Sequence, residues 1–197
     1  MHDAPALPSV RSALLGVTLV VWLVSEWRRA RHQRADAARA TVAPRGRRGR
    51  LAGPLAVATL IALAARRWFP RADLHATAVL AGAGLGLAWL GLALRWWSFA
   101  TLGDYFTFTV MASPDQPVVA RGPYRLVRHP SYVGVIAIVV GIAIARANVV
   151  GVAVALVLAV GGAVARIHVE ERLLVEILGA RYEQYARGRA RLVPGLW

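Results

Sequence analysis

Long apolar runs alternate with short polar stretches along this chain, and that alternation predicts membrane helices. Five such runs stand out, and they cover about residues 12–27, 51–69, 74–97, 132–145 and 149–167. Only Arg146, Ala147 and Asn148 separate the last two runs, so these should form a tight antiparallel helical hairpin. The pattern therefore predicts an all-α integral membrane protein, a single membrane domain over residues 1–197 with about five transmembrane helices.

The positive charge is concentrated between the first two runs. Residues 28–50 hold nine arginines against one acidic residue, Asp36. By the positive-inside rule this stretch lies in the cytoplasm, so the N-terminus lies outside. Counting helices onward places residues 98–131 and 168–197 on the cytoplasmic side as well, and we expect these two segments to carry the catalytic site. The charge of residues 28–50 and their lack of periodicity predict that they are not packed.

Composition narrows the class of protein further. The chain is 57% hydrophobic and its formal net charge is +14. The arginines lie in the loops between apolar runs, where anionic lipid headgroups are nearer partners than nucleic acid. The absence of cysteine excludes disulfides, a thiolate nucleophile and a cysteine metal site. Abundant arginine without lysine is typical of a GC-rich, bacterial genome, which suggests a bacterial inner membrane.

The third run is rich in glycine. Gly82-Ala-Gly-Leu-Gly86 is not read as a nucleotide-binding loop, because it lacks the third glycine at the required spacing and no strand precedes it. The spacing of Gly82 and Gly86 instead predicts a close approach between helices. Further along, the pattern of residues 168–179 predicts a helix that ends at Gly179. Tyr182 and Tyr185 lie one turn apart on a further short helix, in a tail expected to lie along the membrane surface.

The most polar, least helix-compatible segment between the apolar runs is Gly122 to Tyr132. Pro123 and Pro130 lack a backbone N–H, and each disfavours the helical conformation of the residue before it. A shaped loop should therefore lie directly against the fourth run. It carries several groups suited to binding: Arg121, Tyr124, Arg125, Arg128, His129 and Tyr132.

A second polar group follows at the inner end of the fifth run. Glu170 and Glu171 may be interpreted as two solvated charges after a membrane helix. Arg166, however, precedes Glu170 by one turn, so the two share a face and are able to pair. Ionisable groups in or near membrane helices are costly, which favours a functional interpretation. We expect this group and the loop at His129 to form one active site at the membrane surface.

The chemistry of that site is limited by what the sequence lacks. There is no Ser-His-Asp order, no HExxH motif and no phosphate loop. His129 is a candidate capping or packing residue, or a metal ligand, but no spacing among the five histidines is typical of a metal site, so no metal is expected. A reaction in which a cofactor carries the reactive group, such as methyl transfer from a sulfonium, is compatible with these limits.

Two motifs resemble a known family. The first is Gly-x-Tyr-(x)4-His-Pro-Ser-Tyr-x-Gly from Gly122 to Gly134. The second is Arg-(x)3-Glu-Glu-(x)7-Gly-(x)2-Tyr-(x)2-Tyr from Arg166 to Tyr185, followed by Pro194. Together they resemble the isoprenylcysteine carboxyl methyltransferase family of membrane enzymes, which use S-adenosylmethionine. The resemblance covers about residues 101–194.

The resemblance implies roles for individual residues. Arg166 would be the catalytic residue that meets the substrate carboxylate, and Glu170 would bind the ribose hydroxyls or the amino group of the cofactor. The substrate would be a prenylated cysteine or another lipophilic small molecule taken from the membrane lipids. The remaining residues expected to bind S-adenosylmethionine are Gln116, Pro117, Val118, Val119, Tyr124, His129, Pro130, Ser131 and Tyr132.

Other functions share parts of this pattern. A similar Arg-His-Pro-x-Tyr stretch occurs in phospholipid and thiol methyltransferases, and in membrane sterol reductases that use a nicotinamide cofactor such as NADPH. A membrane scaffold or transporter accessory is the non-enzymatic alternative, and it would need no buried polar site. Neither the nucleophile nor the oligomeric state follows from the sequence.

Overall fold

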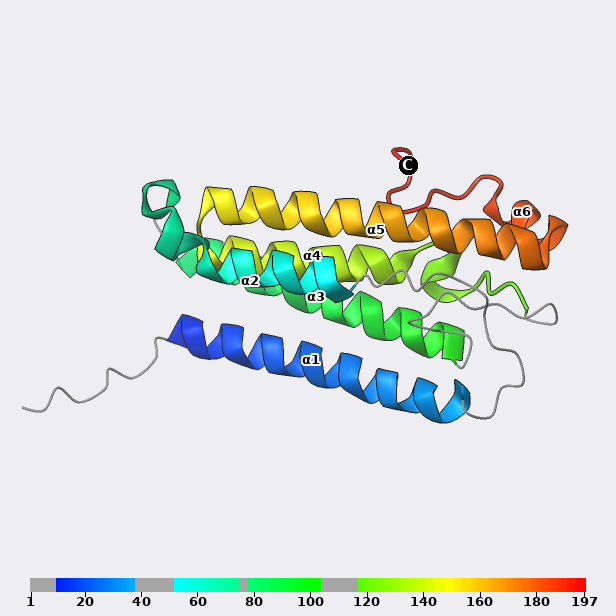
Figure 1. Ribbon diagram of the computed structural model, residues 1–197, viewed down its shortest axis with the longest axis horizontal. Coiled ribbons are helices and arrows are strands. Elements are labelled where there is room, and N and C mark those ends of the chain that lie inside the picture. The colour runs from blue at the N-terminus through cyan, green and yellow to red at the C-terminus, as the bar shows by residue number, and fades with distance from the viewer. Residues whose placement is uncertain (1–9, 38–51, 75–77, 104–116) are drawn as a thin grey trace, which may run out of the picture.

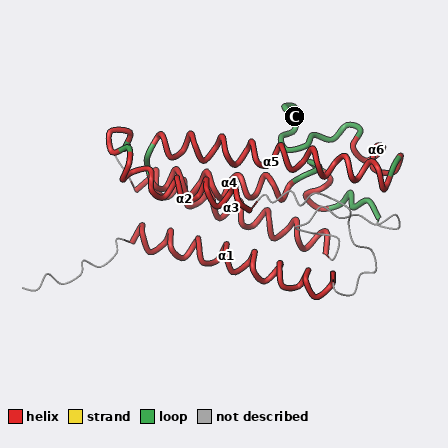
Figure 2. Tube along the Cα trace, in the orientation of Figure 1, coloured by secondary structure: helices red, strands yellow, loops and turns green. Residues whose placement is uncertain are grey.

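The computed structural model describes residues 10–37, 52–74, 78–103 and 117–197 of this chain. These residues form helices joined by short loops, with two isolated β-bridges (Figure 2). The α-helices are α1 (Val10–Ala37), α2 (Ala52–Trp68), α3 (Ala78–Leu102), α4 (Pro130–Arg146), α5 (Val149–Leu178) and α6 (Ala180–Ala186). Two short 3-10 helices, η1 (Pro70–Ala72) and η3 (Gly122–Arg125), lie between them.

Helices α1 to α5 lie along one long axis and alternate in direction (Figure 1). α4 lies at the centre, where it contacts α2, α3 and α5, while α1 packs mainly against α3 on the outside. The core consists of small and β-branched side chains from these helices, such as Ala88, Ile138, Ile142 and Ala159. The bundle ends with α6 and the C-terminal segment, which lie beside the far end of α5 (Figure 1).

The tightest contact in the bundle joins α3 and α4 through glycines. A Cβ atom on Gly84 would lie 2.6 Å from the carbonyl oxygen of Gly141, and one on Gly91 would lie 2.6 Å from that of Gly134. The backbones therefore touch at two points, which only glycine permits. The prediction for Gly82 and Gly86 was wrong, because nothing in the described structure lies within 4 Å of a Cβ added at either position.

The predicted hairpin of α4 and α5 is confirmed. Ala147 turns the chain with a left-handed φ of 55°, and the Asn148 side chain caps α5 by accepting a hydrogen bond from the Gly151 amide at 2.9 Å. The Asn148 amide also donates to Asp73, at 2.7 Å. The Asp73 carboxylate pairs with Arg66 at 2.9 Å, so one polar cluster ties both turns at this end of the bundle.

Two helices are longer than their apolar runs. The helix predicted over 168–179 is confirmed as the last part of α5, which continues unbroken from Val149 to Leu178 and ends, as expected, at Gly179. No glycine or proline between 163 and 178 interrupts it. Likewise α1 runs on to Ala37, so the prediction that 28–50 is unpacked was wrong for its first part. The Arg29 side chain donates to the Gly103 carbonyl and lies 5.5 Å from the Phe99 ring centroid.

Three of these helices are long and apolar enough to cross a membrane. They are α1, over Val10–Arg31, α3 and α5. α4 is apolar but shorter, with 17 residues, and α2 has the same length. Trp96 and Trp97, expected to end the third run, lie inside α3, which extends to Leu102.

Candidate active site

The two motifs meet at one end of the bundle. The first motif occupies η3, the loop after it and the start of α4, and the second occupies the last half of α5 and α6. Figure 1 shows these elements together beside the C-terminal segment. The segment closes over the loop through backbone hydrogen bonds: the Arg128 amide donates to the Ala190 carbonyl at 2.9 Å and the His129 amide donates to the Arg191 carbonyl at 3.0 Å.

Local sequence shapes the loop as the prolines predict. Gly122 has a φ of +57°, and a Cβ atom there would lie 2.6 Å from the Thr101 hydroxyl, so glycine is required on both counts. Pro130 is the first residue of α4, where its missing N–H costs nothing. His129 precedes it in a non-helical conformation and is buried, with 4% of its surface exposed.

A chain of hydrogen bonds links Tyr132, Glu170 and Arg166. The Tyr132 hydroxyl donates to a Glu170 carboxylate oxygen at 2.7 Å, and the Arg166 Nε donates to the same hydroxyl at 3.3 Å. Arg166 is 6% exposed and Tyr132 is 9% exposed, while Glu170 is half-buried. The structure therefore brings together three of the predicted site residues from both motifs.

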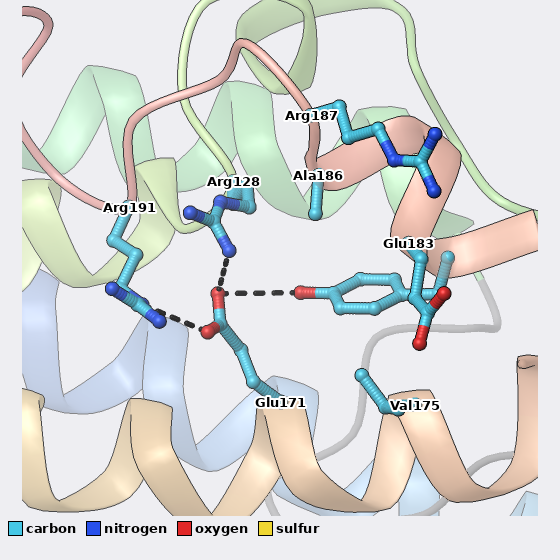
Figure 3. Close-up of a pocket in the computed structure, with 8 residues that line it drawn as sticks. Arg128, Glu171, Val175, Glu183, Ala186, Arg187 and Arg191 are labelled. Carbon is cyan, nitrogen blue, oxygen red and sulfur yellow. Dashed lines mark hydrogen bonds and ion pairs between the residues drawn. The ribbon is translucent and has the colours of Figure 1, made fainter. Parts of the chain in front are cut away.

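Glu171 lies on a neighbouring face of α5 and binds more partners. Its carboxylate accepts from Arg128 at 2.7 Å and from Arg191 at 2.8 Å, and the His129 Nε2 lies 3.2 Å from one of its oxygens. The Tyr182 hydroxyl donates to it at 3.4 Å. Figure 3 shows Arg191 reaching this carboxylate from the left and Arg128 reaching it from above.

A cavity of about 390 Å³ lies beside this cluster. Arg128, Glu171 and Tyr182 line it, together with Glu183, Arg187 and Arg191 (Figure 3). None of the residues predicted to bind the cofactor lines it. The predicted residues that are brought together therefore lie on the Glu170 side of α5, and the cavity lies on the Glu171 side.

Three buried phenols of the site stay protonated. Burial raises the pKa of Tyr124 well above its usual value, with a smaller effect from the negative charge of Glu170. Burial, followed by the charge of Glu171, raises the pKa of Tyr182 in the same way. Burial raises the pKa of Tyr185 to about 12, and its hydroxyl donates to the Tyr124 carbonyl at 2.9 Å. All three are therefore hydrogen-bond donors at neutral pH.

The other predicted cofactor residues are dispersed. Gln116 lies outside the described residues. Pro117 is exposed, and Val118 packs against the apolar cluster of Leu178, Tyr182 and Tyr185. Val119 is half-buried in the loop. Ser131 is buried in the first turn of α4, and its carbonyl accepts a hydrogen bond from Arg95 at 3.1 Å.

Several residues of this region were missed by sequence reasoning. Arg128 was expected only as one of several binding groups in the loop, and its ion pair with Glu171 was not predicted. Arg191, Glu26 and Arg95 were not singled out at all. The sequence did contain a signal for Glu171, since it is a second carboxylate in the same polar motif and no role had been assigned to it. In the described part of the chain, no group of three or more histidine, aspartate or glutamate residues is placed to hold a metal.

Comparison with known proteins identifies the relationship. A model of the isoprenylcysteine carboxyl methyltransferase family matches residues 84–176, which run from within α3 through the first motif to the last turn of α5. The match thus takes in Arg166, Glu170 and Glu171 of the second motif, but not its part on α6. Over these residues, the chain is related to the isoprenylcysteine carboxyl methyltransferase family. The match includes Tyr132, Arg166 and Glu170, but neither α1 nor the C-terminal segment.

Individual relatives agree with the family. Protein-S-isoprenylcysteine O-methyltransferase A of Arabidopsis thaliana is 32% identical over 113 residues, which are 56% of this chain and 57% of that protein. Protein-S-isoprenylcysteine O-methyltransferase of Tribolium castaneum is 32% identical over 117 residues, which are 58% of this chain and 42% of that protein. The chain thus matches about half the length of these curated relatives.

A solved structure shares the fold. It is that of the eukaryotic intramembrane Ras methyltransferase, isoprenylcysteine carboxyl methyltransferase, with a TM-score of 0.61 and 27% identity. The likeness covers 72% of this chain and 51% of that one. Together with the three long apolar helices, it marks this chain as a multi-pass membrane protein with the helical fold of that enzyme family.

Proposed function

We propose that this protein transfers a methyl group from S-adenosylmethionine to the carboxylate of a lipophilic, isoprenylcysteine-like compound at the membrane surface. The observation that carries the proposal is the meeting of the family's two motifs at the Tyr132–Glu170 hydrogen bond, one turn of α5 from the buried Arg166. The family match, which names carboxyl methylation, supports the same reaction.

The residues on the Glu170 side of α5 have the chemistry that S-adenosylmethionine requires. Its sulfonium and amino group are cations, which favour a carboxylate and the faces of tyrosine rings. Glu170 supplies the carboxylate, and the buried Tyr132 hydroxyl donates to it at 2.7 Å. Tyr124 is also buried, and the charge of Glu170 adds to the effect of burial in raising its pKa. The ribose hydroxyls of S-adenosylmethionine need a hydrogen-bond acceptor, which Glu170 also provides. When bound, the cofactor supplies an electrophilic methyl group.

The full cofactor set that we propose keeps the predicted residues. It comprises Gln116, Pro117, Val118, Val119, Tyr124, His129, Pro130, Ser131, Tyr132 and Glu170. His129 enters this set through its ring, which lies 5.7 Å from that of Tyr132. Its imidazole is held by Glu171, so it would shape the pocket and leave Glu170 for the ligand.

Arg166 is the residue we assign to the substrate. A guanidinium binds a carboxylate through two parallel hydrogen bonds and so fixes its orientation. The Arg166 Nε is directed to the Tyr132 hydroxyl, which keeps the side chain next to the cofactor residues. Since the side chain is 6% exposed, a carboxylate bound to it would be stripped of most of its water, which makes it a better nucleophile.

We further propose that α1 to α5 all cross the membrane, with the site in the cytoplasm and the N-terminus outside. The direction of the helices supports this, because the C-terminal ends of α1, α3 and α5 lie at the site end of the bundle (Figure 1). Arg28, Arg29 and Arg31 are at the same end, as the positive-inside rule expects of a cytoplasmic face. A bacterial inner membrane is the location that we propose on composition.

Calorimetry on the detergent-purified protein tests the class of cofactor. We expect saturable binding of S-adenosylmethionine and no binding of a reduced nicotinamide cofactor titrated in parallel. Binding of the nicotinamide cofactor alone would place the protein among the membrane reductases. Binding of neither by a folded protein would support the scaffold alternative.

Arg166→Ala tests the substrate assignment. We expect the affinity for S-adenosylmethionine to change by less than about threefold, while methyl ester formation on a farnesylated cysteine analogue falls by about a hundredfold or more. Arg172→Ala is the matched control, because Arg172 is exposed on the same helix. Unchanged turnover in Arg166→Ala would remove Arg166 from the substrate role.

A further inference from the structure

A buried ion pair joins α1 to α3 on the far side of the active site from α5. The Glu26 carboxylate accepts two hydrogen bonds from the Arg95 guanidinium, from Nε at 2.5 Å and from Nη2 at 2.8 Å. The side chain of Arg95 is 7% exposed and that of Glu26 is 23% exposed. The Trp22 indole also donates to this carboxylate, at 3.2 Å. Glu26 lies outside the residues that match the family, whereas Arg95 lies inside them.

Docking of α1 does not by itself explain this pair. Charged groups in membrane helices are costly, and a buried ion pair is often no more stabilising than packed apolar residues. α1 and α3 already share a cheaper polar contact, in which the Trp89 indole donates to the Thr18 hydroxyl at 3.2 Å. Leu15 and Trp22 of α1 are also buried in the core. The pair therefore calls for a reason beyond holding α1 in place.

The remaining guanidinium nitrogen of Arg95, Nη1, supplies that reason. The Nη1 of Arg95 donates to the Ser131 carbonyl at 3.1 Å, in the first turn of α4. Ser131 stands between Pro130 and Tyr132, and the Tyr132 hydroxyl is bonded to Glu170. Arg95 thus binds Glu26 with one edge and the backbone of the proposed cofactor site with the other.

The surroundings leave the guanidinium little freedom. It lies 4.7 Å from the centroid of the Phe99 ring, and a Cβ atom on Gly134 would lie 3.1 Å from the Arg95 Cβ. The α3 and α4 backbones are in contact at this level, so the side chain emerges from a fixed point. One turn further along α3, Ser98 is buried and its hydroxyl donates to the Leu94 carbonyl at 2.7 Å.

We propose that Glu26 and Arg95 are positioning residues for the cofactor site. Glu26 holds the guanidinium in the orientation in which Nη1 fixes the Ser131 carbonyl, and this sets the first turn of α4 and the place of the Tyr132 hydroxyl. α1 is then part of the apparatus that shapes the site, although it lies outside the family match. The inference rests on the proposed function for its ligand, S-adenosylmethionine.

Glu26→Gln tests the proposal with Thr18→Val as the matched control. The first change weakens the hold on Arg95 and keeps the size of the side chain. The second removes a different polar contact between α1 and α3, the one with Trp89, and does not touch Arg95. We expect Glu26→Gln to raise the Kd for S-adenosylmethionine about tenfold, as loss of one charge-assisted interaction would. We expect both variants to lower the Tm by similar amounts, but Thr18→Val should leave the Kd unchanged.

Hydrogen exchange separates this proposal from the proposed function. Without any cofactor, we expect faster exchange at residues 126–134 in Glu26→Gln than in Thr18→Val. If the wild-type protein bound no S-adenosylmethionine, the proposed function would fail, but faster exchange confined to Glu26→Gln would still uphold the positioning role. Unchanged exchange and an unchanged Kd in Glu26→Gln would overturn the inference and leave the proposed function standing.

A charge exchange sharpens the test. The double variant Glu26→Arg with Arg95→Glu restores a pair between α1 and α3, but a carboxylate at 95 is unable to donate to the Ser131 carbonyl. We expect its Tm to recover towards the wild-type value while its Kd stays raised. Full recovery of the Kd would overturn the proposal. If the double variant does not fold, Arg95→Lys replaces it, with a raised Kd expected because one ammonium does not reproduce the three-sided contact.

Discussion

Glu170 and Glu171 are neighbours on α5, yet they face different parts of the molecule. Glu171 is bound by Arg128, Arg191 and Tyr182 and lies against His129, so its partners come from the loop, from α6 and from the C-terminal segment. Glu170 is half-buried and accepts from the Tyr132 hydroxyl, next to Arg166. One carboxylate is thus occupied by the protein, and the other lies where the two motifs meet.

This difference shows how one helix supports both the site and the frame around it. Successive residues of a helix point about 100° apart, so a pair of acidic residues necessarily serves two faces. The face of Glu171 binds together three segments that are distant in sequence. The face of Glu170 is directed to the residues that we assign to the cofactor and substrate. The comparison predicts that equal substitutions at the two positions have unequal effects.

The largest effect is expected from Glu171→Gln. An amide replaces the buried charge that neutralises Arg128 and Arg191, so two half-buried cations are left without their charged partner. We expect the free energy of unfolding to fall by about 3 kcal/mol, as for other broken buried ion pairs. Thermal unfolding in detergent measures this, and Glu176→Gln, at an exposed position on the same helix, is the control. A Tm equal to that of the control would contradict the framing role of Glu171.

Glu170→Gln should show the reverse pattern. We expect the Kd for S-adenosylmethionine to rise about a hundredfold, because a charged acceptor for the cofactor is lost. The Tm should stay close to that of the wild type, since the amide oxygen of glutamine still accepts from Tyr132. Calorimetry and thermal unfolding on the same preparation test both parts. Wild-type affinity in this variant would remove Glu170 from the cofactor site.

The smallest effect is expected from Tyr182→Phe. This change removes only the longest of the hydrogen bonds to Glu171, at 3.4 Å, and leaves both arginines in place. We expect a loss of stability below about 1 kcal/mol and no change in cofactor affinity. A larger loss than in Glu171→Gln would show that the tyrosine, rather than the ion pairs, is what holds α6 to α5.

Much of the architecture follows from the sequence, because it depends on local rules. The hairpin at Ala147 and Asn148 was predicted from two apolar runs with three residues between them. The loop at Pro123 and Pro130 was predicted from backbone chemistry that depends on nothing else in the fold. The end of α5 at Gly179 is a further case, since its φ of 54° is one that glycine adopts readily.

The failures concern faces of helices and contacts between distant segments. Gly82 and Gly86 have the spacing of a helix contact, but the face that meets α4 belongs to Gly84 and Gly91, which are seven residues apart. Spacing alone does not say which side of a helix its neighbour occupies. A pattern that extends over two turns and is matched in the partner, as by Gly134 and Gly141, is the better signal.

The ion pairs show the same limit for the site. Arg191 belongs to neither motif, so nothing in its local sequence links it to Glu171. Arg95 and Glu26 are 69 residues apart in the chain. A single arginine near the end of an apolar run is ordinary in a membrane protein, so only the fold reveals which carboxylate it meets. The hydrogen bond from Tyr132 to Glu170 was not predicted either, although the two motifs that supply these residues were expected to lie together.

The backbone contact between the loop and the C-terminal segment has a consequence for synthesis. The Arg128 side chain adds a hydrogen bond to the Arg189 carbonyl, and these two residues are separated by 61 positions. Both α4 and α5 lie between them. As the ribosome adds residues in order, the amides of Arg128 and His129 emerge long before the carbonyls of Ala190 and Arg191 exist. The helical hairpin is therefore synthesised while its loop is still open. The loop is closed only once the C-terminal segment has been made, so the site is completed after both of the helices that it joins.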